Sequence, residues 1–222
     1  MPKDVGLNYW TQGRGKKRGD SIADRVLYEG QQLDKRDKPY IKGRDIEFFH
    51  LVFSNRWLKH NYNQLLDPDI DTFRFSPDFL ECEKIVYRQT SDELIATIDD
   101  SGLLVDKTLH VVVLKPEWKT KLELRYLLGL LNSKLLTHVY REMAQEEGRT
   151  FAQVKTFRVR ELPLPDASDA DRAAIAKLVQ KCLNSRGERV AVNGRTEEID
   201  QRVYRLYGMT PEEIKIVEEA SK

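Results

Sequence analysis

The sequence is poor in the residues that build disulfide frameworks and metal centres. It has two cysteines, Cys82 and Cys182, and they lie a hundred positions apart, so neither a disulfide framework nor a zinc knuckle is expected. Its four histidines are scattered, and none of them forms the His-x-x-x-His spacing of a helical metal site. The composition therefore predicts no metal site, no catalytic cluster and no cofactor site within this chain.

Long apolar runs and nucleotide-binding loops are also missing from the sequence. No apolar stretch approaches the roughly 18 residues of a membrane span, and the N-terminus has no apolar signal region. The one Gly-x-Gly sequence, Gly13-Arg14-Gly15, lacks the preceding strand and the spacing of a dinucleotide-binding fingerprint. Together with the low cysteine content, these features predict a protein of the reducing cytoplasm.

Charge is plentiful, and it is unevenly distributed along the chain. Charged residues make up 33% of the 222 residues, with a net charge of +1. Residues 1–60 carry 13 basic and 8 acidic side chains (+5), residues 61–120 carry 6 and 12 (−6), and residues 121–165 carry 8 and 5 (+3). Phosphate contacts need clustered lysine and arginine, so a DNA-binding face would draw on the first and third segments.

The middle of the chain predicts a small sheet followed by a helix. Four runs rich in β-branched and other apolar residues lie between residues 84 and 114, which indicates a short antiparallel meander. A long loop is expected at residues 67–78, where two prolines interrupt an acidic stretch. Residues 122–146 place leucines at helical spacing, which predicts one long helix covering a face of the sheet.

Beyond Pro165 the apolar pattern is helical. Ser168 is placed to cap a helix that ends near Asn184, a polar connection follows to Arg195, and a further helix is predicted over residues 197–207. Gly208 suits a left-handed helix end, and residues 210–213 combine a capping box with a proline at the first helical position. We therefore predict an α+β fold with an antiparallel or mixed sheet, divided into an α+β domain (residues 1–165) and a C-terminal helical appendage (residues 166–222).

Four phrases of the sequence, in this order, resemble a known family. They are Tyr40-Ile41-Lys42-Gly43-Arg44-Asp45-Ile46, Lys84-Ile85-Val86-Tyr87-Arg88-Gln89-Thr90, Leu130-Leu131-Asn132-Ser133-Lys134-Leu135 and Leu162-Pro163-Leu164-Pro165. Together they resemble the TaqI-like C-terminal specificity domain, the target-recognition domain of adenine-specific DNA methyltransferases, including enzymes fused to restriction endonucleases. Residues 198–214 resemble the helical end common in such enzymes.

The resemblance implies a partner domain in the same enzyme. That domain would carry a glycine-bearing S-adenosylmethionine loop and an Asn/Asp-Pro-Pro-Tyr/Phe tetrapeptide that holds the flipped adenine. No two prolines are adjacent in this sequence, so the tetrapeptide is not within it. We therefore interpret the chain as a fragment that begins at Met1 and recognises double-stranded DNA for a methyltransferase catalytic domain in cis.

The strongest candidates for phosphate contacts are basic residues in two segments. Arg14, Lys16, Lys17 and Arg18 lie among glycines that let the backbone follow a groove, although a solvated basic loop would have the same sequence. In the phrase around residue 43, Lys42 and Arg44 could reach a phosphate or a guanine edge. Surface ion pairing with Asp45 or Glu47 is the alternative for both residues.

Two further segments offer side chains that could read bases. Arg88 and Gln89 end a predicted strand, where Arg can pair with guanine and Gln with adenine, or where both can satisfy local backbone groups. After the long helix, Arg149, Gln153 and Lys155 carry donors in a glycine-relieved loop, beside apolar residues expected to pack. His110, in an apolar strand, is expected to be a hydrogen-bonded structural histidine.

Two other functions remain open on the sequence. The chain could be a protein-interaction module of a restriction or phage-defence complex, docking through its helical tail. It could also be a hydrolase fragment, if Pro77-Asp78 and Glu117-x-Lys119 formed a nuclease motif, although Glu117 follows a predicted strand rather than lying in one.

Overall fold

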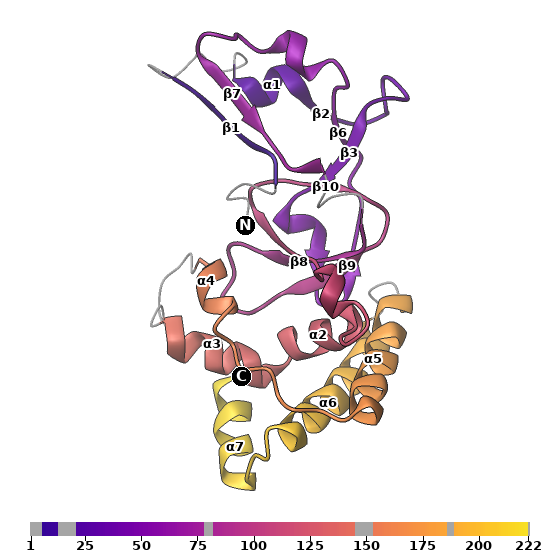
Figure 1. Ribbon diagram of the computed structural model, residues 1–222, viewed down its shortest axis with the longest axis vertical. Coiled ribbons are helices and arrows are strands. Elements are labelled where there is room, and N and C mark those ends of the chain that lie inside the picture. The colour runs from indigo at the N-terminus through magenta and orange to yellow at the C-terminus, as the bar shows by residue number, and fades with distance from the viewer. Residues whose placement is uncertain (1–5, 13–20, 78–81, 145–152, 186–188, 222) are drawn as a thin grey trace.

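The computed structural model describes residues 6–12, 21–77, 82–144, 153–185 and 189–221. Figure 1 shows β1, β2, β3, β6 and β7 at the top, the sheet that contains β8 and β9 in the middle, and the C-terminal helices below. Sheets and helices therefore occupy different parts of the chain, which confirms the α+β class. No helix in the described part of the chain is both long and apolar enough to cross a membrane.

The N-terminal half is built from short strands around one hydrophobic core. Its strands are β1 (Asn8–Thr11), β2 (Leu27–Glu29), β3 (Lys38–Ile41), β4 (Ile46–Glu47), β5 (His50–Leu51), β6 (Arg56–Leu58) and β7 (Asp71–Arg74). Its helices are α1 (Ile22–Val26) and two short 3₁₀ turns, η1 (Gly43–Asp45) and η2 (Tyr62–Leu65). The buried residues of this core include Ile22, Val26, Tyr40, Ile41, Leu58 and Val105.

The acidic stretch predicted as a loop contains a strand. Within residues 67–78, β7 pairs with β1 in an antiparallel two-stranded sheet, with Tyr9 opposite Phe73. This pairing joins segments about sixty residues apart, and β7 is short, so local sequence patterns did not reveal it. The prediction of a continuous loop was wrong over Asp71–Arg74.

The predicted meander is also arranged differently. The strands β8 (Lys84–Arg88), β9 (Ala96–Asp99) and β11 (Leu109–Val112) form one antiparallel sheet with β8 at its centre. Between β9 and β11 the chain leaves this sheet, and β10 (Leu104–Val105) pairs in parallel with β3. Sheet order is therefore β11-β8-β9, because the β10 excursion returns the chain to the other edge of β8.

The long helix predicted over residues 122–146 is two helices. A 3₁₀ turn, η4 (Pro116–Trp118), precedes α2 (Leu124–Leu131) and α3 (Lys134–Ala144). Asn132 leaves the helical path because its side chain pairs with both backbone groups of Ala96 in β9, at 2.9 Å each. Ser133 then begins α3, since its Oγ accepts from the Leu136 N–H at 3.2 Å. The predicted covering of the sheet is confirmed, with α2 packed on β8 and β9.

Four helices complete the chain: α4 (Thr156–Val159), α5 (Asp169–Asn184), α6 (Arg189–Leu206) and α7 (Pro211–Ala220). The Ser168 cap, the left-handed Gly208 (φ 65°) and the capping box at Thr210 are confirmed. The connection expected up to Arg195 is wrong, because α6 already begins at Arg189 and includes Gly194.

A second hydrophobic core joins the C-terminal helices to the sheet. Its members come from both sides of residue 165 and include Ile85, Tyr87, Leu128, Leu136, Ile175, Val179, Ile199, Val203 and Val217. Gly129 of α2 permits this contact, since a Cβ there would lie 2.6 Å from Ile175 Cγ2. Residues 166–222 thus share their buried surface with the sheet and its covering helices.

Candidate nucleic-acid interface

Three of the predicted DNA-contacting segments meet around Thr108. The Gly43 N–H donates to Thr108 Oγ1 at 2.9 Å, and the Gln89 N–H donates to the Thr108 carbonyl at 2.9 Å. The Val154 N–H in turn donates to the Gln89 carbonyl at 2.7 Å. We call this assembly the polar edge: loop 42–46, residues 88–90, turn 106–108 and segment 153–155.

Arg88 holds the loop of the polar edge in place. Its Nε lies 3.0 Å from the Gly43 carbonyl oxygen and 3.1 Å from that of Ile46, and its Nη2 donates to Ile46 at 2.6 Å. The side chain therefore satisfies backbone groups, which is the alternative left open by the sequence. A base contact by Arg88 stays a prediction, with two of its three nitrogens already engaged.

Lys42 and Arg44 lie on the loop that Arg88 holds. The Lys42 N–H donates to Asp45 Oδ2 at 2.7 Å, and its ammonium lies 5.7 Å from the centre of the Tyr40 ring. The Arg44 side chain is 63% exposed and pairs with Glu29 at 3.1 Å, rather than with the neighbouring acids suggested by the sequence. Both cations therefore remain at the surface, where a phosphate can compete for them.

Asp45 is unavailable to Arg44 because it belongs to a buried network under the loop. Arg56 Nη1 donates to one carboxylate oxygen of Asp45, and Ser54 Oγ donates to the other at 2.8 Å. Arg56 also donates to Glu29 at 2.7 Å, and this hydrogen bond lowers the pKa of Glu29. The network fixes the loop from below.

The segment that follows α3 is fixed by a buried tyrosine and by a histidine. Tyr140 Oη donates to the Gln153 carbonyl at 3.1 Å and accepts from the Lys155 N–H at 2.8 Å. His110 lies 3.1 Å, through Nε2, from the Val154 carbonyl oxygen, and burial lowers the pKa of its imidazole. The expectation of a structural histidine is confirmed.

Gln153 adds one residue pair to the sheet beyond the end of β8. It forms an isolated antiparallel bridge with Thr90, directly after β8, and it is exposed. Gln89 is half-buried and precedes that bridge by one residue. The structure therefore brings Gln89 and Gln153 together, although they are 64 positions apart in the sequence.

Several predicted sites lie outside the described residues. They are Arg14, Lys16, Lys17, Arg18, Arg149 and Asp78, the last from the nuclease alternative. Glu117, from the other half of that nuclease motif, lies on η4, where its carboxylate is 3.9 Å from the Lys115 ammonium. Among the residues that the structure describes, no three histidine, cysteine or acidic side chains form a metal site.

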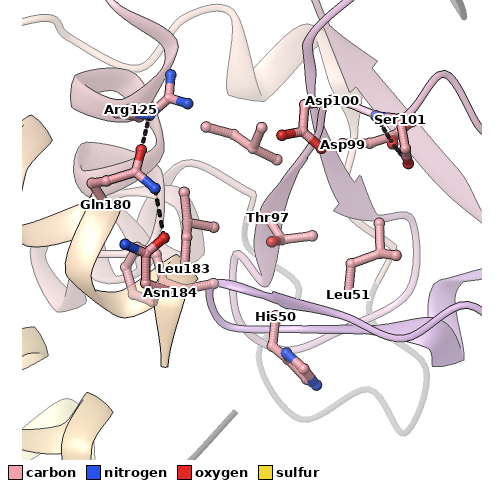
Figure 2. A pocket seen from close by; sticks show the side chains of 12 residues that line it. His50, Leu51, Thr97, Asp99, Asp100, Ser101, Arg125, Gln180, Leu183 and Asn184 are labelled. Atoms are coloured by element: carbon pink, nitrogen blue, oxygen red, sulfur yellow. Dashed lines mark hydrogen bonds between the residues drawn. The ribbon is translucent and has the colours of Figure 1, made fainter. Parts of the chain in front are cut away.

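A pocket of about 410 Å³ lies between β9 and α5, away from the polar edge. Figure 2 shows that polar side chains on its helical wall bond to one another. Arg125 donates to Gln180, and Gln180 donates to Asn184 at 2.9 Å. On the opposite wall, Asp99 is ion-paired with the fully buried Lys84. These four polar side chains are satisfied by their neighbours, whereas the buried Thr97 Oγ1 on the sheet wall has no hydrogen-bond partner among the described residues. We assign the pocket to packing between sheet and helix.

The polar edge falls within the segment that identifies the chain. Residues 38–164, more than half of the chain, match the TaqI-like C-terminal specificity domain, and the chain belongs to this family. It is also 29% identical over 147 residues to a protein of Methanocaldococcus jannaschii that is named as a type II restriction enzyme and methyltransferase. That match covers 64% of this chain and 12% of the relative.

A solved structure shares the fold. It is the type IIL restriction-modification enzyme MmeI in complex with DNA, with a TM-score of 0.60 and 11% sequence identity. The match covers 94% of this chain and 33% of the MmeI chain. The chain thus spans a third or less of the length of these two proteins.

Sequence reasoning missed three parts of the surface. No sequence pattern singled out Thr108, which connects the loops of the polar edge. Lys107, whose ammonium lies 5.1 Å from the centre of the Tyr9 ring, was likewise not singled out. The pair of Trp10 and Arg74 depends on the pairing of β1 with β7, which is not local in sequence.

Proposed function

We propose that this chain recognises a specific sequence in double-stranded DNA on behalf of an adenine-specific DNA methyltransferase of a restriction-modification system. The proposal rests on the position of the polar edge within the residues that match the family. The residues matched by the specificity-domain family are 38–164, and every described residue of the polar edge lies within them. The proposal treats this edge as the surface that meets DNA.

The side chains of the polar edge divide by chemistry into two roles. Lys42, Arg44 and Lys155 are cations suited to phosphates, which fix the register of a protein on the duplex. Gln89 and Gln153 carry amides, which can pair with adenine in the major groove. The rigid support from Arg88 and Tyr140 would hold both sets in one geometry.

A catalytic domain in the same polypeptide would carry out the methyl transfer. S-adenosylmethionine would bind there and supply the methyl group. It would not bind to this chain, whose sequence has no glycine-rich fingerprint between a strand and a helix. In the proposed complex this module contacts the major groove while the catalytic domain holds the flipped adenine. Such an enzyme would act on DNA in the cytoplasm.

The competing proposal is a protein-interaction module of a defence complex. Membership in a specificity-domain family and the similarity to restriction-modification proteins favour DNA recognition over it. The two differ physically, because binding to DNA releases counterions from the duplex and therefore weakens strongly with salt.

The test is a titration of the chain with a mixed-sequence duplex at increasing salt. We expect weak binding whose logarithm falls linearly with the logarithm of salt concentration. Replacing Lys16, Lys17 and Arg18 with alanine should flatten that slope by up to about one unit for each lost phosphate contact. A chain that binds no duplex, or binds with no salt dependence, would contradict the proposed function.

The matched control removes three lysines far from the polar edge. Lys177 and Lys181 on α5 and Lys215 on α7 are exposed, so their replacement with alanine changes the net charge by the same amount. This control variant should keep the slope of the unaltered chain. An unchanged slope in the Lys16, Lys17 and Arg18 variant would instead assign those residues to a solvated loop.

A further inference from the structure

The β1–β7 ribbon has two faces of different character. Its register places Asn8 opposite Arg74, Tyr9 opposite Phe73, Trp10 opposite Thr72 and Thr11 opposite Asp71. Side chains alternate along a strand, and directly opposed residues share a face. One face of the ribbon, the inner face, therefore carries Tyr9, Thr11, Asp71 and Phe73. The other, the outer face, carries Asn8, Trp10, Thr72 and Arg74.

Aromatic contacts attach the inner face to the rest of the molecule. Tyr9 stacks on Phe73, with 5.8 Å between ring centres. Phe73 in turn lies 5.1 Å from Tyr62 and 6.1 Å from Phe75, measured between ring centres.

Hydrogen bonds to a carboxylate fix the same face. Asp71 accepts hydrogen bonds from Arg25 Nη2 at 2.5 Å and from Thr11 Oγ1 at 2.8 Å. These bonds keep the one carboxylate of the ribbon strands on the inner face, where Arg25 neutralises it. The ribbon is thus held in place with its outer face turned away from the core.

The outer face combines an exposed aromatic ring with an exposed cation. Trp10 is 41% exposed, and the Arg74 guanidinium carbon lies 5.4 Å from the centre of its ring. This contact supports the planar guanidinium without using its hydrogen-bond donors. The face also presents a threonine hydroxyl and an asparagine amide. Arginine, amide, hydroxyl and apolar surface are the groups that read base edges in a major groove.

The ribbon continues directly from the polar edge. The Leu7 N–H, one residue before β1, donates to the Val105 carbonyl at 2.7 Å. Lys107, within the turn of the polar edge, places its ammonium 5.1 Å from the centre of the Tyr9 ring. The polar edge and the ribbon are therefore neighbours in the structure, and the ring that lies under Lys107 belongs to the inner face.

We propose that the outer face of the β1–β7 ribbon enters the major groove of DNA, which is wide enough for a two-stranded β-ribbon. In this arrangement Arg74 donates to a guanine edge, and Trp10 contacts a thymine methyl group or the edge of a neighbouring base. The inference rests on the proposed function and adds base-contacting residues to it. The family match begins at residue 38, so β1 lies outside the matched residues.

The chain offers a closely matched control. Trp118 is 47% exposed and lies on η4, in the connection between β11 and α2, with 5.5 Å between its ring centre and the Lys121 ammonium. Trp10→Ala and Arg74→Ala can therefore be compared with Trp118→Ala and Lys121→Ala. Thermal unfolding of all four variants reports whether the fold is intact, and Arg74→Ala tests the face even if removal of the Trp10 ring unfolds the ribbon.

The experiment measures the affinity of the full chain for a mixed-sequence duplex at low salt. We expect Trp10→Ala and Arg74→Ala each to weaken binding about tenfold, and the two control variants to change it less than about twofold. A second duplex, with its major groove filled by bulky 5-substituents on its pyrimidines, should bind the unaltered chain at least about tenfold more weakly than the unmodified duplex does, and Trp10→Ala should cause little further loss on it. In a background that carries both Trp57→Phe and Trp118→Phe, Trp10 is the one remaining tryptophan, and adding the unmodified duplex should also change its fluorescence.

The possible failures are distinguishable. Equal binding by ribbon and control variants would overturn the inference, while salt-dependent binding by the unaltered chain would leave the proposed function standing. Unchanged affinity for the filled duplex would overturn the major-groove assignment. Ribbon variants that keep their DNA affinity but no longer associate with a methyltransferase catalytic domain would show that the outer face binds protein instead. Absence of any duplex binding by the unaltered chain would overturn the proposed function itself.

Discussion

Arg88 is the predicted base reader whose surroundings point most clearly to another role. Its guanidinium bonds to the carbonyls of Gly43 and Ile46, so it positions the loop that carries Lys42 and Arg44. Hydrogen bonds from a charged group contribute about 1.5–3 kcal/mol to stability. A lysine in its place has no planar fork with which to reach both carbonyls.

We predict that Arg88→Ala lowers the free energy of unfolding by about 1–3 kcal/mol, and that Arg88→Lys restores little of this loss. DNA affinity should fall for all sequences alike, because the loop loses its position rather than a base contact. Denaturant unfolding and binding to a panel of duplexes measure the two effects, with Lys177→Ala on α5 as the control. Unchanged stability together with relaxed choice at one base pair would instead establish Arg88 as a base reader.

Single residues were predictable where their partners are close in sequence. Ser168 caps α5 through Asp171, and Thr210 forms its capping box with Glu213, both within one helical turn. The partner of Arg44 was not predictable, because Glu29 is brought to it by the pairing of β2 with β6. Side chains that act locally leave a pattern in the sequence, whereas side chains that join distant strands do not.

The same distinction governs the secondary-structure elements. The strands of the central sheet and the helices after residue 165 have regular apolar spacing, and the sequence predicted them. Strand β7 was missed because its partner is β1, and the break between α2 and α3 was missed because the leucine spacing continues across it. The cause of that break is Asn132, whose side-chain amide bonds to the backbone N–H and carbonyl of Ala96, as a neighbouring strand would.

Asn132 therefore provides a test at the scale of the element. Ala96 is 1% exposed, so Asn132→Ala would leave its N–H without a partner, while its carbonyl would still accept from the Phe49 N–H at 3.1 Å. We predict a loss of about 1–3 kcal/mol in the free energy of unfolding, from one unsatisfied buried group. Asn132→Asp keeps the acceptor but loses the donor, so its loss should be smaller than that of the alanine variant. A stability change below about 0.5 kcal/mol for Asn132→Ala would rule out this account of the helix break.

At the scale of the whole molecule, the sequence predicted the class of the fold, and the division into two domains at residue 165 stays a prediction. A division at residue 165 separates the sheet from the last helices, yet Ile175, Ile199 and Val217 lie in one core with Tyr87 and Leu128. The family match ends at residue 164, close to the predicted division. Similarity in sequence and continuity of the hydrophobic core thus mark different boundaries, because helices that vary in sequence can still cover the same apolar surface.

The specificity of the whole enzyme gives the last prediction. In a polypeptide that joins this chain to a methyltransferase catalytic domain, Gln89→Ala and Gln153→Ala should each cost about 1–3 kcal/mol at one base pair and relax the choice of base there. Arg149, outside the described residues, is predicted to behave in the same way. Lys155→Ala should weaken methylation evenly across sequences, as loss of a phosphate contact does, and Lys177→Ala on α5 should leave it unchanged.

Sequencing the methylated adenines of cells that carry each variant measures all of these effects. If the recognition sequence is unaltered in every glutamine and arginine variant, base reading lies elsewhere on the module, and the outer face of the β1–β7 ribbon becomes the first surface to test by the same method.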